Sequence, residues 1–419
     1  MWVAYGEHIS RTKIESYFPL DRLPAEPSDN PPLTPLYDAL ITNLPHPVMA
    51  YPSLPFPPST GIFPKASVVE EYLETYASCF HLNEHIRLNT SVVDVSRAAD
   101  QWQVTLSTGE QLYYDLIIVS NGHYRLPRYP ATQGLQRWID AGKATHSAWY
   151  RHPDPTFKRI VVVGAGPSGS DIASETSAVS VVFHSVTEPT SALQRCRIAK
   201  YCDDTSTVVF EDGTQETGID HCYIATGYQI DFPFFSSSLI PIQQPEKYVP
   251  MPTVLTNSTS HVYPLARFIW PVQQQTLYPP TTLAFLGLPV RVVPFPLAEA
   301  QMSAVLKAFR DPSSFDIDAQ RAALVERYER LSGKPLDKMW HKFEGLEQFD
   351  YRDSLHSYAG EDQTVPEWAK TMYGKKDLLK RVWQKLVKEG KAERFVRGVG
   401  KKDPWLEWIE LIETMYDMD

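Results

Sequence analysis

The chain has 419 residues, 43% of them hydrophobic, and a formal net charge of −10. That length suits one large or two medium domains, and the negative charge argues against a nucleic-acid-binding surface. No apolar stretch approaches the roughly 18 residues that a membrane-spanning helix needs, and the first eight residues do not resemble a signal peptide. Four cysteines without metal-ligand spacing predict neither a disulfide scaffold nor a metal site, so a cytoplasmic protein is expected.

The first 64 residues are rich in proline and irregular. Apolar spacing predicts a helix over 67–80, and residue patterns predict strands at 86–88, 91–95, 102–106, 111–114 and 115–120. A short meander is expected at 208–214, with apolar strands at 221–228 and 281–288. Residues 297–419 are expected to be mainly helical. Their last apolar stripe should face a core, and the basic run 375–402 should be a solvated surface.

The most informative segment is a short apolar run, 160–163, followed by a Gly-x-Gly-x-x-Gly turn and a predicted helix. The turn reads Gly164, Ala165, Gly166, Pro167, Ser168, Gly169, Ser170. The first glycine permits the tight turn, the second lets backbone approach a pyrophosphate, and the third lets the helix pack closely on the strand. The helix N-terminus would offer free N–H groups to the phosphates. The segment therefore predicts a dinucleotide-binding site.

Two further apolar strands also end in glycine, the first at Asn121 and Gly122 and the second at Thr226 and Gly227. Open α/β sheets bind ligands at the carboxyl ends of their strands. These four residues are therefore added to the predicted cofactor-binding residues.

The order of these segments resembles that of the flavin-containing monooxygenases, the class B flavoprotein monooxygenases. The similarity also includes Thr42 to Pro45, the spaced signature Gly142, His146 and Tyr150, and the segment from Leu283 to Gln301. The resemblance implies an α/β fold with two nested Rossmann-like domains and a helical C-terminal region. The expected division is an FAD-domain part at 1–153, an NAD(P)H-binding domain at 154–228, and the second FAD-domain part with the helical region at 229–419.

The resemblance implies FAD and NADPH as cofactors and a small-molecule substrate with O2 as the reaction partners. A C4a-hydroperoxyflavin would oxygenate a nucleophilic nitrogen or sulfur, so no acid–base dyad is required. Asn43 is the predicted active-site residue, because its amide donates and accepts together. From the residue alone, a loop-turning asparagine is the simpler interpretation. Gln301 is expected to bind a cofactor, and His146 to be structural.

The chain departs from the family pattern at two places. The family carries an earlier glycine turn for FAD that ends in Gly-Gly-x-Trp, and Trp2 stands where that tryptophan is expected. The first FAD βαβ unit is therefore expected to be missing, with an incomplete chain as the favoured explanation. The family also places an arginine after the second strand of the nicotinamide unit, where this chain has Val186. Arg195, Arg197 or Lys200 could supply the cation for the 2′-phosphate. NADPH remains what the resemblance implies, but this departure weakens it.

Two alternative functions stay open. A Baeyer–Villiger monooxygenase has the same architecture but carries tryptophan at the position of Tyr150. A flavin-free nicotinamide-binding protein would explain a missing first glycine turn. The sequence does not determine the substrate, whether nitrogen or sulfur is oxidised, the choice between NADPH and NADH, or the oligomeric state.

Overall fold

The computed structural model describes residues 35–243, 249–274 and 277–418, which form two compact units. Apart from these gaps, unit 1 comprises residues 40–122 and 234–418, and unit 2 comprises residues 35–39 and 123–233. The chain thus leaves unit 1 after Gly122 and returns to it at Phe234. Trp2 lies outside the described residues.

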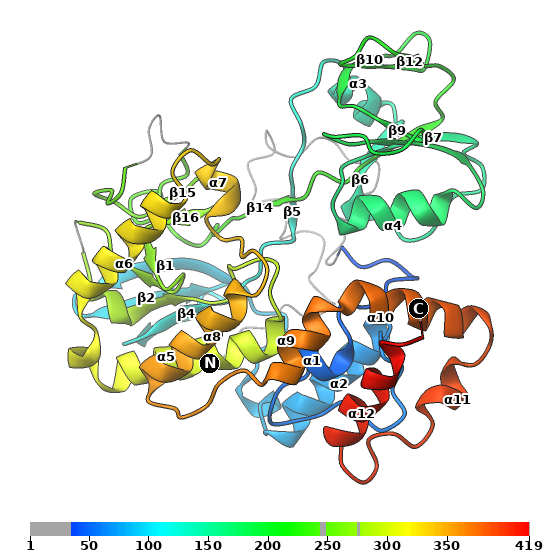
Figure 1. The fold of residues 1–419 in the computed structure, drawn as a ribbon. Coiled ribbons are helices and arrows are strands. Elements are labelled where there is room, and N and C mark those ends of the chain that lie inside the picture. The colour runs from blue at the N-terminus through cyan, green and yellow to red at the C-terminus, as the bar shows by residue number, and fades with distance from the viewer. Residues whose placement is uncertain (1–34, 244–248, 275–276, 419) are drawn as a thin grey trace. The chain divides into compact units, whose positions relative to one another are not determined.

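Unit 2 is built on a parallel sheet in the order β6-β13-β7-β8-β9 (Figure 1). Its central strand is β7 (Arg159–Val163), whose residues 160–162 are buried as an apolar strand covered on both faces requires. Helix α4 (Pro167–Thr176) packs against one face. Helix α3 (Leu135–Asp140) and the antiparallel sheet β10-β11-β12 cover the other face. The remaining strands are β5 (Leu126–Pro127), β6 (Ala144–His146), β8 (Val181–Ser185), β9 (Gln194–Arg195), β10 (Ile198–Cys202), β11 (Thr207–Phe210), β12 (Gln215–Glu216), β13 (His221–Ile224) and β14 (Tyr228–Gln229).

Unit 1 contains an antiparallel sheet, β1 (Val92–Ala98), β2 (Gln101–Leu106) and β3 (Gln111–Tyr114). It also contains a parallel pair, β4 (Ile117–Val119) and β19 (Leu283–Phe285). Four short strands form two further pairs: β15 (Thr256–Asn257) with β16 (Val262–Tyr263), and β17 (Leu265–Ala266) with β18 (Trp270–Pro271).

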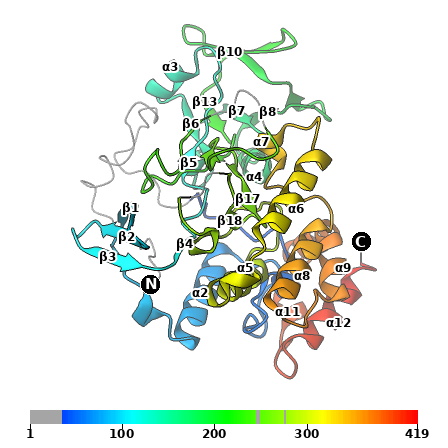
Figure 2. The ribbon, with the colours of Figure 1, turned by 90° about the vertical axis from the view of Figure 1, so that its left-hand side faces the viewer.

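Helices make up most of the rest of unit 1, and α5 and α8 lie side by side (Figure 2). One core joins α5 to β19, α6, α7 and α8 around the fully buried Trp270 and Trp340. The helices are α1 (His46–Met49), α2 (Ala66–Cys79), α5 (Pro294–Arg310), α6 (Ile317–Arg330), α7 (Leu336–Met339), α8 (Glu347–Ala359), α9 (Glu367–Gly374), α10 (Lys376–Lys388), α11 (Ala392–Val396) and α12 (Leu406–Met415). Single 3₁₀ turns occupy η3 (Asn83–His85), η4 (Ser147–Trp149), η5 (Pro280–Thr282) and η6 (Pro312–Ser314).

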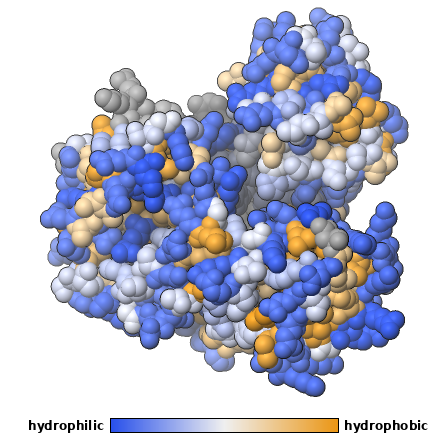
Figure 3. Space-filling view, viewed as in Figure 1, coloured by the Kyte–Doolittle hydropathy of each residue, from blue (hydrophilic) through white to orange (hydrophobic). Residues whose placement is uncertain are grey.

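A second core packs the C-terminal helices against the segment around residue 43. Leu44, Val48 and Ile62 contact side chains of α9, α10 and α12, including Trp408 and Met415. The expected apolar stripe of the last helix is therefore confirmed. Helix α10 is amphipathic, and its charged residues lie on the side away from this core. Hydrophilic side chains make up much of the surface of unit 1 on the face shown in Figure 3.

Most of the predicted elements are confirmed within a few residues, including the helix at 67–80 and the strands at 102–106 and 111–114. The strand predicted at 86–88 is wrong. That segment follows the 3₁₀ turn η3 and enters a turn at Leu88 and Asn89, where Asn89 has φ 54° and Leu88 is exposed. No helix among the described residues is long and apolar enough to cross a bilayer.

Candidate functional site

The glycine turn of unit 2 connects β7 to α4 and depends on two very close backbone contacts. Gly164 has φ 119°, and a Cβ on it would lie 2.3 Å from the carbonyl oxygen of Ala225. A Cβ on Gly169 would lie 2.0 Å from the carbonyl oxygen of Gly164. Any side chain at either position would therefore force strand, turn and helix apart.

Gly166 has a different role, because it borders open space. Within the described part of the chain, a Cβ on Gly166 would meet no atom within 4 Å, and no side chain caps the helix that begins at Pro167. Ala165, Gly166 and Pro167 are exposed, as is Ser170. Ser168 is half-buried and Gly169 is buried. An uncapped helix N-terminus beside an open glycine turn suits a pyrophosphate, so these residues fit the dinucleotide.

The strand end at Thr226 and Gly227 is held by hydrogen bonds within unit 2. Thr226 Oγ1 donates to the carbonyl oxygen of Arg128, whose own N–H donates to the carbonyl oxygen of Gly227. His146 Nδ1 accepts from the N–H of Ala148 at 3.1 Å, so Nε2 carries the proton that is donated to Gly227 O at 3.0 Å. Burial lowers the pKa of His146 to about 4 and keeps the ring neutral. These bonds fix the backbone where the chain leaves β13, at Thr226 and Gly227.

Two tyrosines hold α4 in place: Tyr37, which the sequence did not indicate, and Tyr150, which it indicated only as part of the spaced signature. Tyr37 Oη donates to Asp171 at 2.5 Å, and Tyr150 Oη donates to Glu175 at 2.6 Å. The two acids lie four residues apart and therefore share one face of the helix. In the sequence, only the helical spacing of Asp171 and Glu175 could have pointed to these two contacts. Tyr150 thereby gains a structural role in orienting the helix of the glycine turn.

The region beyond β8 shows which cation is available for a 2′-phosphate. Val186, at the position of the family arginine, is buried. Arg195 forms an ion pair with Glu216 at 2.9 Å. Arg197 is exposed and contacts Thr187, directly after Val186, through its Nε and Nη2 at 3.4 Å. Lys200 is exposed on β10. Of the three cations considered, Arg197 lies beside the strand end and has no acidic partner among the described residues.

In unit 1, β4 and β19 run parallel, so their carboxyl ends lie together. Asn121 and Gly122 follow β4 and are exposed, and Gly287 follows β19. Gly122 and Gly287 have φ 72° and 73°, and a Cβ on either would meet no atom within 4 Å. Both strand ends therefore leave backbone open to a ligand.

Gln301 is fully buried on α5, and its carboxamide is used inside the protein. Its Oε1 accepts from the N–H of Gly287 at 3.0 Å, and its Nε2 donates to Tyr351 Oη at 3.0 Å. Tyr351 Oη in turn donates to the carbonyl oxygen of Arg267 at 2.6 Å. The structure thus places Gln301 as a residue that positions the end of β19.

Asn43 is exposed in a bend that is fixed on both sides. The N–H of Thr42 donates to Pro64 O and the N–H of His46 donates to Ile62 O, each at 2.9 Å. The Asn43 side chain makes no hydrogen bond in the part of the chain that the structure describes, so it neither caps a helix nor closes a turn there. A free carboxamide on a rigid bend can donate from Nδ2 and accept at Oδ1.

His46 follows this bend and is buried among aromatic rings. Its ring lies 4.5 Å from that of Trp408 and 5.1 Å from that of Phe56, measured between centroids. Neither ring nitrogen has a hydrogen-bond partner among the residues that the structure describes, and burial lowers the pKa of His46 to about 3. His46 is therefore a neutral packing residue. No group of three or more metal-binding side chains occurs among the described residues.

The described residues fit a dinucleotide in unit 2, where the open glycine turn meets an uncapped helix. In unit 1, the two open strand ends fit the approach of a flavin. The Gly-x-Gly-x-x-Gly pattern occurs once in these 419 residues, so the sequence offers no second turn of that kind for the FAD pyrophosphate.

Comparisons with known proteins agree with this geometry. The model of the flavin-binding monooxygenase-like family matches residues 26–205 and 190–263. Flavin-containing monooxygenase FMO GS-OX-like 4 of Arabidopsis thaliana is 28% identical over 394 residues, which cover 86% of this chain and 81% of the relative. The thiol-specific monooxygenase of Saccharomyces cerevisiae is 29% identical over 291 residues, 65% of each chain. The solved structure of S-allyl-L-cysteine S-oxygenase from Allium sativum has the same fold, with a TM-score of 0.69 at 24% identity over 95% of this chain and 88% of that one.

Proposed function

Because the chain belongs to the flavin-binding monooxygenase-like family, whose members are monooxygenases that use FAD and NADPH, we propose that it oxygenates a nucleophilic sulfur or nitrogen of a small molecule. When bound, NADPH supplies a hydride to FAD and the reduced flavin activates O2. The protein then has to bind both cofactors, orient them and exclude water.

Different residues of this chain would bind and orient the two cofactors. Gly164 to Ser170 and the N-terminus of α4 would hold the pyrophosphate of NADPH. The strand ends at Gly122 and Gly287 would lie against the flavin, with Gln301 keeping the second of them in place. Tyr37 and Tyr150 would keep α4 aligned with the dinucleotide.

The free carboxamide of Asn43 is the observation that carries the proposal. A carboxamide that has no other partner can both donate to and accept from a reacting group beside it. Asn43 is exposed, its bend is fixed by two backbone hydrogen bonds, and its amide has no partner among the described residues. Its Nδ2 would donate a hydrogen bond to the reacting oxygen.

Sulfur is the favoured nucleophile, because one of the similar curated proteins is a thiol-specific monooxygenase. Nitrogen stays within the proposal, since the attacking atom need only be soft and nucleophilic. The Baeyer–Villiger alternative is weakened by Tyr150, whose hydroxyl is used to hold Glu175. A flavin-free binding protein does not agree with the enzymes that the chain resembles.

The test is an assay of the purified protein with added FAD, NADPH and ¹⁸O2, using a thioether, a thiol, a tertiary amine and a ketone as separate substrates. We expect one labelled oxygen atom in the thioether, thiol or amine product and NADPH consumption that matches it. Labelled ester from the ketone alone would support the Baeyer–Villiger reading. NADPH binding without any labelled product or bound flavin would support the flavin-free alternative.

A further inference from the structure

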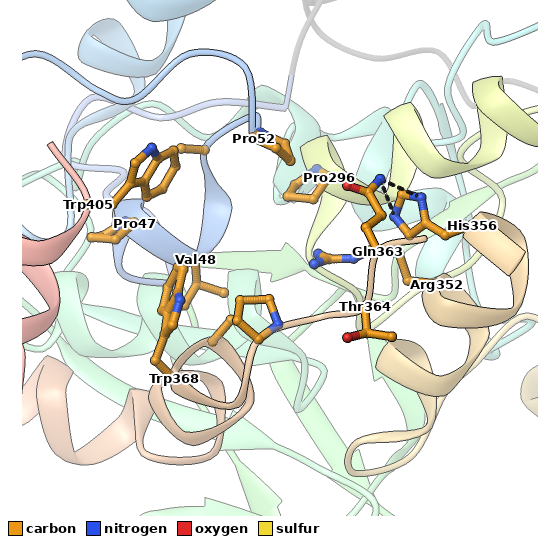
Figure 4. A pocket seen from close by; sticks show the side chains of 13 residues that line it. Pro47, Val48, Pro52, Pro296, Arg352, His356, Gln363, Thr364, Trp368 and Trp405 are labelled. Atoms are coloured by element: carbon orange, nitrogen blue, oxygen red, sulfur yellow. Dashed lines mark hydrogen bonds between the residues drawn. The ribbon is translucent and has the colours of Figure 1, made fainter. Parts of the chain in front are cut away.

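A cleft of about 190 Å³ opens in unit 1 between α1, α8 and the segment that leads into α9 (Figure 4). Its two sides differ in chemistry. Pro47 and Val48 of α1 lie on one side with Trp368 and Trp405. On the other side the guanidinium of Arg352 points toward the centre of the cleft. The cleft therefore combines an apolar aromatic wall with a cation.

Arg352 forms no direct ion pair among the described residues. Its Nε is inaccessible to solvent and has no hydrogen-bond partner in the described part of the chain. Burial lowers the pKa of Arg352, and the charges of Asp353 and Glu299 oppose this at longer range. Glu299 accepts from Ser53 and Tyr76, and Asp353 accepts from the N–H of Val365. A half-buried guanidinium without a direct ion pair carries a desolvation cost, and a carboxylate bound in contact with it would offset that cost.

The second basic group of the cleft, His356, is already paired. Its Nδ1 lies 2.6 Å from Glu361 Oε2 and 2.7 Å from Gln363 Nε2. Thr364 also lines the cleft and is exposed, with no hydrogen bond from its hydroxyl in the described part of the chain. Arg352 is thus the cation that an incoming anion would meet, and Thr364 offers a hydroxyl on the same side.

We propose that this cleft binds a small aromatic carboxylate, with its carboxylate on Arg352 and its ring against Trp368 and Trp405. The planar guanidinium matches a carboxylate in a two-bond geometry. The two indole rings lie 6.2 Å apart at an angle of 39°, and together they form a wall on which one more ring can pack. The cleft is smaller than the roughly 300–1,000 Å³ of drug-sized sites, so its ligand has about the size of benzoate. The inference does not depend on the proposed oxygenation.

The experiment compares 4-fluorobenzoate with 4-fluorobenzamide by ¹⁹F NMR titration of the full chain. The two ligands share shape and ring, and only the first carries a charge. We expect saturable, millimolar binding of the carboxylate and binding at least about tenfold weaker for the amide, the effect of losing a charge-assisted pair. Arg352→Gln should weaken carboxylate binding by a similar factor, Arg352→Lys by less, and Trp405→Ala should also weaken it. Arg330→Gln, an exposed arginine on α6, is the matched control and should leave the affinity unchanged.

Three results would overturn the proposal. The first is equal affinity of wild-type protein for acid and amide, which needs no variant and so does not depend on how Arg352→Gln folds. The second is wild-type affinity in Arg352→Gln. The third is displacement of the carboxylate by inorganic phosphate at equal concentration together with no effect of Trp405→Ala, because the cleft would then be a general anion site.

Discussion

Gly169 lies directly against Gly164, so close that a Cβ on Gly169 would come within 2.0 Å of the Gly164 carbonyl oxygen. Gly169→Ala should therefore displace α4 from β7. We expect a loss of about 1–3 kcal/mol in stability, the range for overpacked sites, together with at least tenfold weaker NADPH binding. Thermal unfolding and titration calorimetry measure the two effects.

Gly166→Leu is the matched variant, because Gly166 borders open space and not backbone. The leucine side chain would occupy the place of the pyrophosphate without disturbing the fold. NADPH affinity should fall by at least about tenfold while the unfolding temperature changes little. Equal NADPH binding by this variant and the parent would show that the dinucleotide binds elsewhere.

Arg197→Ala tests the cation beside Thr187. A charge-assisted hydrogen bond to phosphate contributes about 1.5–3 kcal/mol, so the Kd and KM for NADPH should rise by about one to two orders of magnitude. The values for NADH should stay the same, because NADH has no 2′-phosphate. Adenosine 2′-phosphate binding provides a readout that does not involve turnover. Lys200→Ala is the control, and an equal loss there would move the phosphate site toward β10.

Asn43→Ala removes the free carboxamide from its bend. Because the two backbone hydrogen bonds that fix the bend remain, the protein should fold and bind its cofactors as the parent does. NADPH oxidation should continue while the oxygenated product falls by about 10²-fold or more, the scale seen for loss of one positioned donor. Hydrogen peroxide release and product yield, measured per NADPH consumed, check this.

Asn83→Ala, on the surface 3₁₀ turn η3 of the same unit, is the control for Asn43. It should leave product yield unchanged. If Asn43→Ala also forms product at the parent rate, Asn43 is a loop residue and the reacting atoms lie elsewhere.

His46 makes unit 1 sensitive to acid. Burial lowers its pKa from 6.5 to about 3, so between these pH values His46 is protonated in the unfolded chain and neutral in the folded protein. This lowers stability progressively as the pH falls from 6.5 toward 3, by up to about 1.4 kcal/mol per pH unit, and has no effect above 6.5. His46→Leu should flatten the pH dependence of unfolding in this window.

Phe56→Leu is the control for His46, because Phe56 packs on the same ring but does not titrate. It should lower the free energy of unfolding by a similar amount at every pH. A pH profile of His46→Leu that runs parallel to that of the parent would contradict the assignment, and the acid sensitivity would then belong to other groups.

The sequence predicted the parts of the fold that depend on local pattern. The apolar run 160–163 and its glycines required a buried strand, a turn and a helix, and β7 and α4 meet that requirement. The segment at 86–88 failed for a non-local reason. Its apolar residues suggested a strand, but Leu88 is exposed and pairs with no strand among the described residues, and the chain turns at Asn89 instead.

The site was less predictable, because contacts between distant residues decide the roles of its side chains. The sequence does not distinguish Arg195, Arg197 and Lys200; the ion pair of Arg195 with Glu216 and the contact of Arg197 with Thr187 separate them. Arg352 could not be selected from the sequence, since its place in the cleft comes from segments that are distant in the chain. The apolar stripe of the last helix was expected to face a core, but Trp405, directly before that helix, lines the cleft.

The hydrogen bonds of Gln301 make the helical tail part of the scaffold at β19. Tyr351, the residue that accepts from Gln301 Nε2, comes 50 positions later in the chain. During synthesis, Gly287 and Gln301 therefore emerge from the ribosome before their last partner does. Until α8 is made, Gln301 lacks the acceptor of its Nε2 and α5 lacks the helix that packs beside it, so the end of β19 is expected to reach its native form only after α8 is synthesised.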